Sequence, residues 1–164
     1  MTNAFAQHFD PALDLTFERI VDVPPALIWK AWTTPELILR WFTPAPWTTV
    51  ACDIDLRPGG KFQTMMRSPE GMEFPNLGCY LEVVENQRLV WTTVLGPGYR
   101  PVAAGPGVLA ITAMIVLEPH GNGTKYSAFA IHSNPADKAK HEAMGFREGW
   151  GKALDQLVEV VRTL

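Results

Sequence analysis

The chain has 164 residues, 47% of them hydrophobic and 19% charged, and its 17 acidic and 14 basic side chains give a net charge of −3. This length fits one domain with a sizeable core, and the hydrophobic share excludes a disordered chain. Without a basic excess a nucleic-acid partner is not expected, no apolar run reaches the ~18 residues of a membrane span, and no secretory signal opens the sequence.

The two cysteines, Cys52 and Cys79, are too few for a disulfide framework, and neither belongs to a CxxC motif. We expect both as reduced thiols packed in the core. With neither a membrane span nor a signal, the expected localisation is cytoplasmic.

The first third of the chain predicts one strand and two short helices. Residues 1–14 are expected as a flexible tail and residues 15–164 as a single domain. Residues 15–22 interleave β-branched and aromatic residues with polar ones, which predicts a strand. Helices are expected at 26–32 and from 36 to about 42, because Pro25 and Pro35 suit a first helical turn. Thr34 is the expected cap of the second helix.

Five or six strands are expected next. Residues 47–56 alternate between two faces, and residues 61–67 return after a proline–glycine–glycine turn. Further strands are predicted at 77–84, 88–95, 109–118 and 125–132. Residues 96–107 hold four glycines and three prolines and predict a long loop, which is either a lid or binding loop or an exposed connector.

A long helix is predicted at the C-terminus. A polar cap precedes Pro135, and the apolar residues after Gly145 fall on one helical stripe. Gly149 and Gly151 flank Trp150, and such glycines indicate a close neighbour, expected to be the sheet. No helix separates successive strands of the meander, so the order of elements predicts an α+β fold with six to seven antiparallel strands around the C-terminal helix.

An ordered set of motifs gives the chain a family resemblance. Residues 23–36 (VPPALIWKAWTTPE), 40–42 (RWF), 55–62 (DLRPGGKF), 78–80 (GCY) and 141–150 (HEAMGFREGW) carry it. The chain resembles the SRPBCC superfamily and, within it, the family called activator of heat-shock protein 90 ATPase homologue 1-like. The resemblance implies a START-like helix-grip fold with an apolar cavity between the curved sheet and the C-terminal helix. Relatives such as START domains, birch-pollen-allergen-like proteins and polyketide cyclases differ in activity, so the fold does not give the function.

No catalytic or metal-binding motif is present, so we predict no catalytic residue, no metal site and no cofactor. Among the four histidines, His132 ends the last predicted strand, in register with Tyr126. It either orients a ligand or acts as a base at the cavity mouth, or it is a turn histidine bonded to backbone. Arg40 either clamps an acidic ligand group or caps the second helix.

Asp53 and Asp55 are the paired carboxylates of the sequence. They lie two residues apart on a predicted strand and therefore share a face. We interpret that face as solvated, with the carboxylates paired to Arg57 or to a cation of the neighbouring strand.

Aromatic and methionine side chains supply the candidate cavity wall. The pool consists of Trp29, Trp32, Phe42, Phe62, Met65, Met66, Tyr80, Trp91, Met114, Phe129, Met144, Phe146 and Trp150. Most of them are expected in the core, and strand parity alone does not say which face looks inward. The predicted ligand-binding residues are Met65, Trp91, Met114, Phe129, His132 and Trp150.

Three functions are compatible with this sequence. The first is non-catalytic binding of a small hydrophobic or aromatic molecule, and the second is a cyclase- or hydrolase-like enzyme using polar cavity residues. The third is a stress-related chaperone partner, which is doubtful because the chain has no room for the additional chaperone-binding domain of the eukaryotic activator. A homodimer is compatible with exposed strand edges and tryptophans.

Overall fold

A seven-stranded antiparallel sheet and four helices make up the fold in the computed structural model, which describes residues 8–103, 105 and 109–164. The main sheet has the order β1-β9-β8-β5-β4-β3-β2. Its strands are β1 (Asp14–Val21), β2 (Thr48–Ile54), β3 (Lys61–Arg67), β4 (Glu73–Val84), β5 (Arg88–Thr92), β8 (Thr112–His120) and β9 (Gly123–Ile131). The helices are α1 (Pro25–Thr33), α2 (Pro35–Trp41), α3 (Pro135–Ala143) and α4 (Phe146–Val161).

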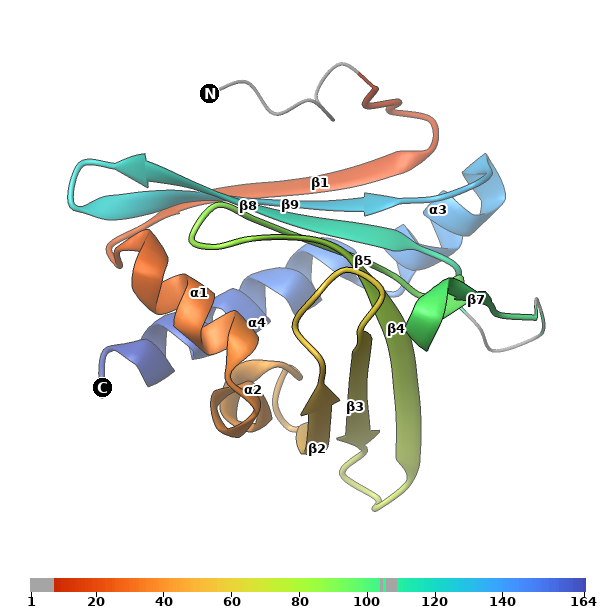
Figure 1. The fold of residues 1–164 in the computed structure, drawn as a ribbon, viewed down its shortest axis with the longest axis horizontal. Coiled ribbons are helices and arrows are strands. Elements are labelled where there is room, and N and C mark those ends of the chain that lie inside the picture. The colour runs from red at the N-terminus through yellow and green to blue at the C-terminus, as the bar shows by residue number, and fades with distance from the viewer. Residues whose placement is uncertain (1–7, 104, 106–108) are drawn as a thin grey trace.

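The sheet curves around the helices. Register shifts interrupt the pairing of β2 with β3 between Thr49 and Ala51, and of β4 with β5 between Tyr80 and Glu82. Such bulges bend the strands that carry them. Figure 1 shows β2, β3 and β4 turning across the direction of β1, β8 and β9, while α1, α2 and α4 lie on one side of the sheet. The predicted helix-grip α+β fold is confirmed.

Three helices begin where the sequence places prolines. Pro25 and Pro35 each stand in a first turn, and Thr34 is the N-cap residue of α2 as predicted, but its side chain makes no capping hydrogen bond. Asn134 does cap α3, because its side-chain oxygen accepts from the backbone N–H of Asp137 at 2.8 Å. Gly145, at φ 88°, divides the predicted long helix into α3 and α4.

The glycine- and proline-rich loop contains more structure than predicted. Leu95–Gly96 (β6) and Arg100–Pro101 (β7) form a small two-stranded sheet around a 3₁₀ turn at Pro97–Tyr99. The backbone N–H of Gly98 donates to the carbonyl of Gly59 at 2.8 Å, which ties this segment to the β2–β3 turn. Residues 104 and 106–108 of the predicted loop lie outside the described residues, and the lid role stays a prediction.

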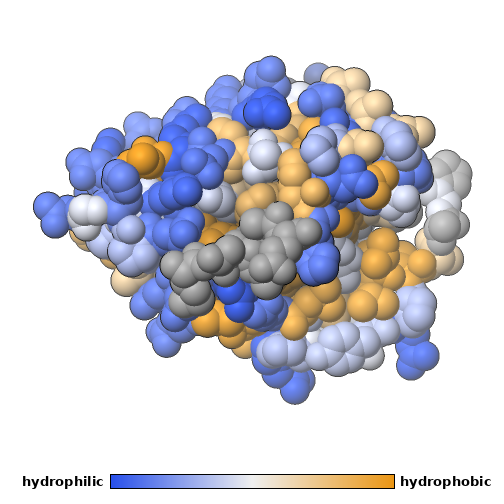
Figure 2. Space-filling view, turned by 90° about the horizontal axis from the view of Figure 1, so that it is seen from above, coloured by the Kyte–Doolittle hydropathy of each residue, from blue (hydrophilic) through white to orange (hydrophobic). Residues whose placement is uncertain are grey.

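The two faces of the sheet are both apolar. The inner face, covered by the helices, holds the main core, which includes Ile115, Tyr126 and Leu157. Outer-face residues Leu81, Val90, Met114, Val116 and Phe129 form a second cluster. Phe9, from the predicted tail, packs edge-on against Phe129 with ring centroids 6.5 Å apart. Figure 2 views the molecule from this outer side and shows apolar residues among polar ones.

Both cysteines are free thiols. Cys79 is buried and Cys52 is half-buried. Burial, with the nearby carboxylates of Asp53 and Glu36 acting in the same sense, raises the pKa of the Cys52 thiol to about 11. The thiol is therefore protonated and unreactive at neutral pH. Within the described part of the chain, no helix combines the length and apolarity that crossing a membrane requires.

Candidate functional site

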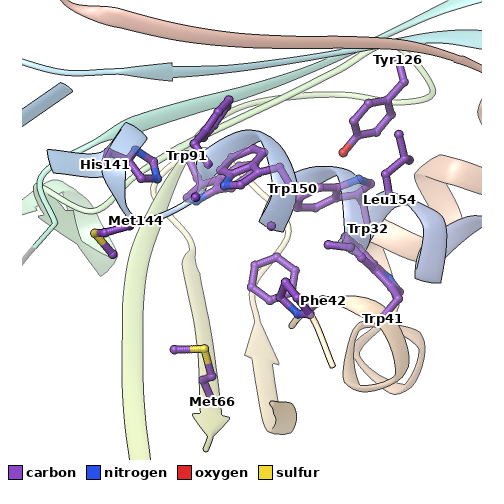
Figure 3. Close-up of a pocket in the computed structure, with 15 residues that line it drawn as sticks. Trp32, Trp41, Phe42, Met66, Trp91, Tyr126, His141, Met144, Trp150 and Leu154 are labelled. Atoms are coloured by element: carbon purple, nitrogen blue, oxygen red, sulfur yellow. The ribbon is translucent and has the colours of Figure 1, made fainter. Parts of the chain in front are cut away.

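A cavity of about 350 Å³ lies between the inner face of the sheet and the helices. Its walls come from both ends of the chain: α1 and α2 on one side, α3 and α4 on another, and β3, β5 and β9 from the sheet (Figure 3). The lining residues are Trp32, Trp41, Phe42, Pro44, Met66, Trp91, Tyr126, His141, Met144, Gly145, Phe146, Gly149, Trp150, Ala153 and Leu154.

One wall is a packed group of aromatic rings. The ring of Trp32 lies 4.7 Å from that of Trp41, 5.2 Å from that of Trp91 and 5.8 Å from that of Phe42, measured between centroids. The indole N–H of Trp41 donates to the carbonyl of Ala31 at 3.0 Å, which fixes this ring against α1. Rings held by several neighbours present a preformed surface to a ligand.

The opposite wall is the first part of α4. Phe146 and Trp150 pack with ring centroids 4.9 Å apart, and Gly149 leaves open space, since an added Cβ would meet only the Pro44 Cγ atom, at 4.0 Å. Met144, 65% exposed, marks the mouth, whereas Leu154, 1% exposed, marks the inner end. The cavity thus opens beside the junction of α3 and α4.

Side-chain hydrogen bonds join α4 to the segment that carries Phe42 and Pro44. The amide nitrogen of Gln156 donates to the carbonyls of Trp41 and Thr43, both at 2.9 Å, and its oxygen accepts from the N–H of Ala45 at 2.9 Å. Lys152 donates to the carbonyl of Ala45 at 2.7 Å. These bonds satisfy the backbone after α2 and hold the two walls at a fixed spacing.

Two polar groups lie at the inner end of the apolar cavity. The indole N–H of Trp32 is buried, and it lies near the Tyr126 hydroxyl without forming a hydrogen bond of normal geometry to any described residue. The hydroxyl of Tyr126 points from β9 into the space that the labelled side chains surround (Figure 3). Burial raises the pKa of Tyr126 well above its ordinary value, with the nearby Trp32 acting in the opposite sense, so the hydroxyl stays protonated. An unpaired buried donor suits a polar atom of a ligand.

A pair of buried histidines lies near the mouth. Nδ1 of His132 is 2.7 Å from the carbonyl oxygen of Leu13, and Nε2 of His132 is 2.9 Å from Nδ1 of His141. His141 lines the cavity and packs edge-on against Phe146 with ring centroids 5.3 Å apart. Burial and the neighbouring His132 lower the pKa of His141 to about 4, so its ring is neutral at pH 7.

The structure brings two of the six predicted ligand-binding residues, Trp91 and Trp150, to the cavity. Met65, Met114 and Phe129 do not line it and need correction. Met114 and Phe129 belong to the outer cluster, and Met65 alternates with its buried neighbours Phe62 and Thr64 on β3, so it too faces outward. Ligand binding by Trp91 and Trp150 stays a prediction.

His132 follows the end of β9 and is buried, but it does not line the cavity, where the ligand-binding interpretation had placed it. Its bond to the Leu13 carbonyl is the backbone contact that the alternative interpretation expected, and His141 stands between it and the cavity. The sequence placed His141 near the start of a helix, but its contact with His132 arises only when α3 folds against the end of β9. The wider candidate pool contained five further lining residues, namely Trp32, Phe42, Met66, Met144 and Phe146. It did not contain the lining residues Trp41, Tyr126, Gly145 and Gly149.

The other charged candidates lie away from the cavity. Asp53 pairs with Lys61 of the neighbouring strand, and Asp55 pairs with Arg57 at 2.7 Å, which confirms the solvated interpretation. Arg40 is exposed and is not a lining residue. Across residues 8–103, 105 and 109–164, no three His, Cys, Asp or Glu side chains gather where they could hold a metal ion.

Comparisons with known proteins agree with this architecture. A family model described as Activator of Hsp90 ATPase homolog 1-like protein matches residues 22–162. The chain is similar to the crystal structure of protein NE0264 from Nitrosomonas europaea, with 47% identity, a TM-score of 0.89, and coverage of 94% of this chain and 97% of that chain.

Two more distant structures share the fold. The solution structure of the AHSA1-like protein from Aeromonas hydrophila has 19% identity and a TM-score of 0.67, covering 92% of this chain and 93% of that chain. Protein Ms6760 from Mycobacterium smegmatis has 21% identity and a TM-score of 0.75, covering 93% of both chains. No curated protein sequence matches the chain.

Proposed function

The chain belongs to the activator of Hsp90 ATPase homolog 1-like family, and within that family we propose that it binds a small, flat apolar or aromatic molecule without transforming it. The observation that carries this proposal is the cavity of about 350 Å³, whose wall includes four tryptophans, Trp32, Trp41, Trp91 and Trp150. Ligand pockets commonly have volumes of ~300–1,000 Å³ and apolar walls with a few polar groups.

The composition of the wall limits the charge of the ligand. No lining residue is an Asp, Glu, Lys or Arg. His141 also lines the cavity, and its ring is neutral at pH 7 because its pKa is lowered to about 4. A charged ligand would lose its hydration without gaining an ion pair, which costs several kcal/mol or more. A neutral ligand is therefore favoured.

The chemistry of His141 favours binding over catalysis. A general base works best with a pKa near the working pH, whereas burial holds the pKa of His141 at about 4. Such an imidazole is a good hydrogen-bond acceptor and a weak base at pH 7. The enzyme, chaperone-partner and homodimer hypotheses stay predictions.

Filling the cavity tests this proposal. The probe is N-phenyl-1-naphthylamine, a flat neutral dye whose fluorescence rises in apolar surroundings. We expect the wild-type chain to bind it, Gly149→Ala to weaken binding moderately, and Gly149→Leu to weaken it tenfold or more, since residue 149 faces the cavity.

Met114→Leu, on the outer face, is the matched control and should bind the dye as the wild type does. Equal dye binding by the wild type and Gly149→Leu would place the dye elsewhere and contradict the proposal. Native mass spectrometry of protein purified gently from its own host then identifies the bound molecule by its mass.

A further inference from the structure

The histidine pair has a defined proton arrangement when both rings are neutral. A carbonyl oxygen only accepts, so Nδ1 of His132 carries the proton that is donated to Leu13. Nε2 of His132 is then an acceptor, and Nδ1 of His141 must donate to it across 2.9 Å. This leaves Nε2 of His141 without a proton, as an acceptor with a free lone pair.

That lone pair belongs to a ring on the cavity wall. His141 is only 6% exposed, and among the described residues no hydrogen-bond partner is found for its Nε2 atom. Phe146 packs against the ring at 5.3 Å and His132 holds its other nitrogen, so the imidazole cannot turn without breaking a buried hydrogen bond. An acceptor fixed in this way selects for a ligand that donates.

We propose that the ligand carries a neutral hydroxyl of the phenol or enol type, which donates its hydrogen bond to Nε2 of His141 while its flat ring system lies among the tryptophans. This inference rests on the proposed function and adds the chemical class of the ligand. The backbone carbonyl of Leu13 and the ring of His132 act as positioning groups, because they set which nitrogen of His141 is free.

Proton affinities keep this contact a neutral hydrogen bond. An ordinary phenol has a pKa of about 10, and burial lowers the pKa of His141 to about 4, so the proton stays on the ligand oxygen. A carboxylate ligand only accepts hydrogen bonds. It is disfavoured because its oxygen lone pairs would face, and be repelled by, the lone pair of Nε2.

The test compares 2-naphthol with 2-methylnaphthalene, two probes of the same shape that differ by a hydroxyl in place of a methyl group. Their dissociation constants are measured by calorimetry on the wild type, on His141→Phe and on the outer-face control Met114→Leu. We expect the preference for 2-naphthol over 2-methylnaphthalene to fall at least fivefold in His141→Phe and to be unchanged in Met114→Leu.

A readout in the unaltered chain guards against a variant that fails to fold. The ¹⁵N chemical shift of Nε2 of His141 should move towards the hydrogen-bonded range when 2-naphthol is added and stay in place with 2-methylnaphthalene. Equal preference in the wild type and His141→Phe, or no movement of the Nε2 resonance at saturating 2-naphthol, would overturn the hydroxyl assignment while leaving the proposed function intact. Failure of both probes to bind would overturn both.

Discussion

The two faces of the sheet have similar apolar composition but very different packing. On the outer face, the side chains of Val90, Met114 and Val116 pack against one another in one cluster. Phe9 packs edge-on against Phe129 on the same face. On the inner face, helices cover the sheet and leave a cavity of about 350 Å³. An apolar face of the sheet therefore forms a cavity wall only where the side chains packed on it leave a gap.

Small residues occupy part of the inner face beside the cavity. Ala113 lies opposite Trp91 on one side and Ala130 on the other, and Ala128 lies opposite Ile115. All three alanines are fully buried. None of the three lines the cavity, so the open space lies between larger side chains, among them the indole rings of Trp32, Trp91 and Trp150.

The largest effect is expected from removing Trp91. Trp91→Ala deletes a ring that packs 5.2 Å from both Trp32 and Phe62, and we expect a loss of about 3–5 kcal/mol in the free energy of unfolding. On the outer face, Met114→Ala should cost about 2 kcal/mol, since its cluster is smaller. Urea denaturation measures both losses.

Dye binding distinguishes the two variants Trp91→Ala and Met114→Ala further. N-phenyl-1-naphthylamine should raise the melting temperature of Met114→Ala as it does that of the wild type, and it should have little effect on Trp91→Ala. A dye response that survives in Trp91→Ala and disappears in Met114→Ala would reverse the assignment of the two faces.

An intermediate effect is expected from pH, because the inner side carries a buried histidine pair that the outer cluster lacks. Unfolding raises the pKa of His141 from about 4 to its ordinary value of 6.5, so between these values the unfolded chain binds the extra proton. The free energy of unfolding should thus decrease as pH falls from 6.5 to 5, by up to about 1.4 kcal/mol per pH unit.

His141→Phe should flatten this dependence, and the control His120→Gln, at the exposed end of β8, should leave it unchanged. Urea titrations at pH 5.0, 5.75 and 6.5 measure the slope in a range where most carboxylates are still ionised. The same slope in His141→Phe and in the wild type would contradict a neutral, buried His141.

The smallest effect is expected at the two glycines of α4, which face different neighbours. An added Cβ at Gly149 points towards the cavity, whereas one at Gly151 comes 3.1 Å from Nη2 of Arg19 and 3.6 Å from the ring of Phe17 on β1. Gly149→Ala should stabilise the chain by about 0.5–1 kcal/mol through helix propensity.

Gly151→Ala should gain less, because the Arg19 side chain must shift to admit the methyl group. Thermal unfolding of both variants compares the two positions. A greater gain at Gly151 than at Gly149 would contradict the packing of α4 against β1.

Sequence periodicity predicted much of the fold. The strand at Lys61–Arg67 has the predicted limits, the other strands of the main sheet lie within a few residues of theirs, and Pro25 and Pro35 begin helices. The division at Gly145 and the small sheet in the glycine-rich segment were not predicted. Both depend on positive φ values and on contacts such as that of Gly98 with Gly59, which arise only in the folded chain.

The candidate site was predictable only in part. Periodicity separates Met114 from Ile115 but does not say which of the two faces the helices, so Met65, Met114 and Phe129 were assigned to the cavity and lie outside it. Trp91 and Trp150 line the cavity, and their contact with a ligand stays a prediction.

By itself the sequence determined the strands of the main sheet, the first two helices, the order of the elements and the family, because these follow from local periodicity, turn residues and an ordered set of motifs. Only the tertiary structure decided which face of the sheet is enclosed and which histidine reaches the cavity. His132 and His141 are nine residues apart in the chain, and their contact, like the bond to Leu13, exists because β1, β9 and α3 pack together. Such contacts between distant segments leave no periodic trace in a single sequence.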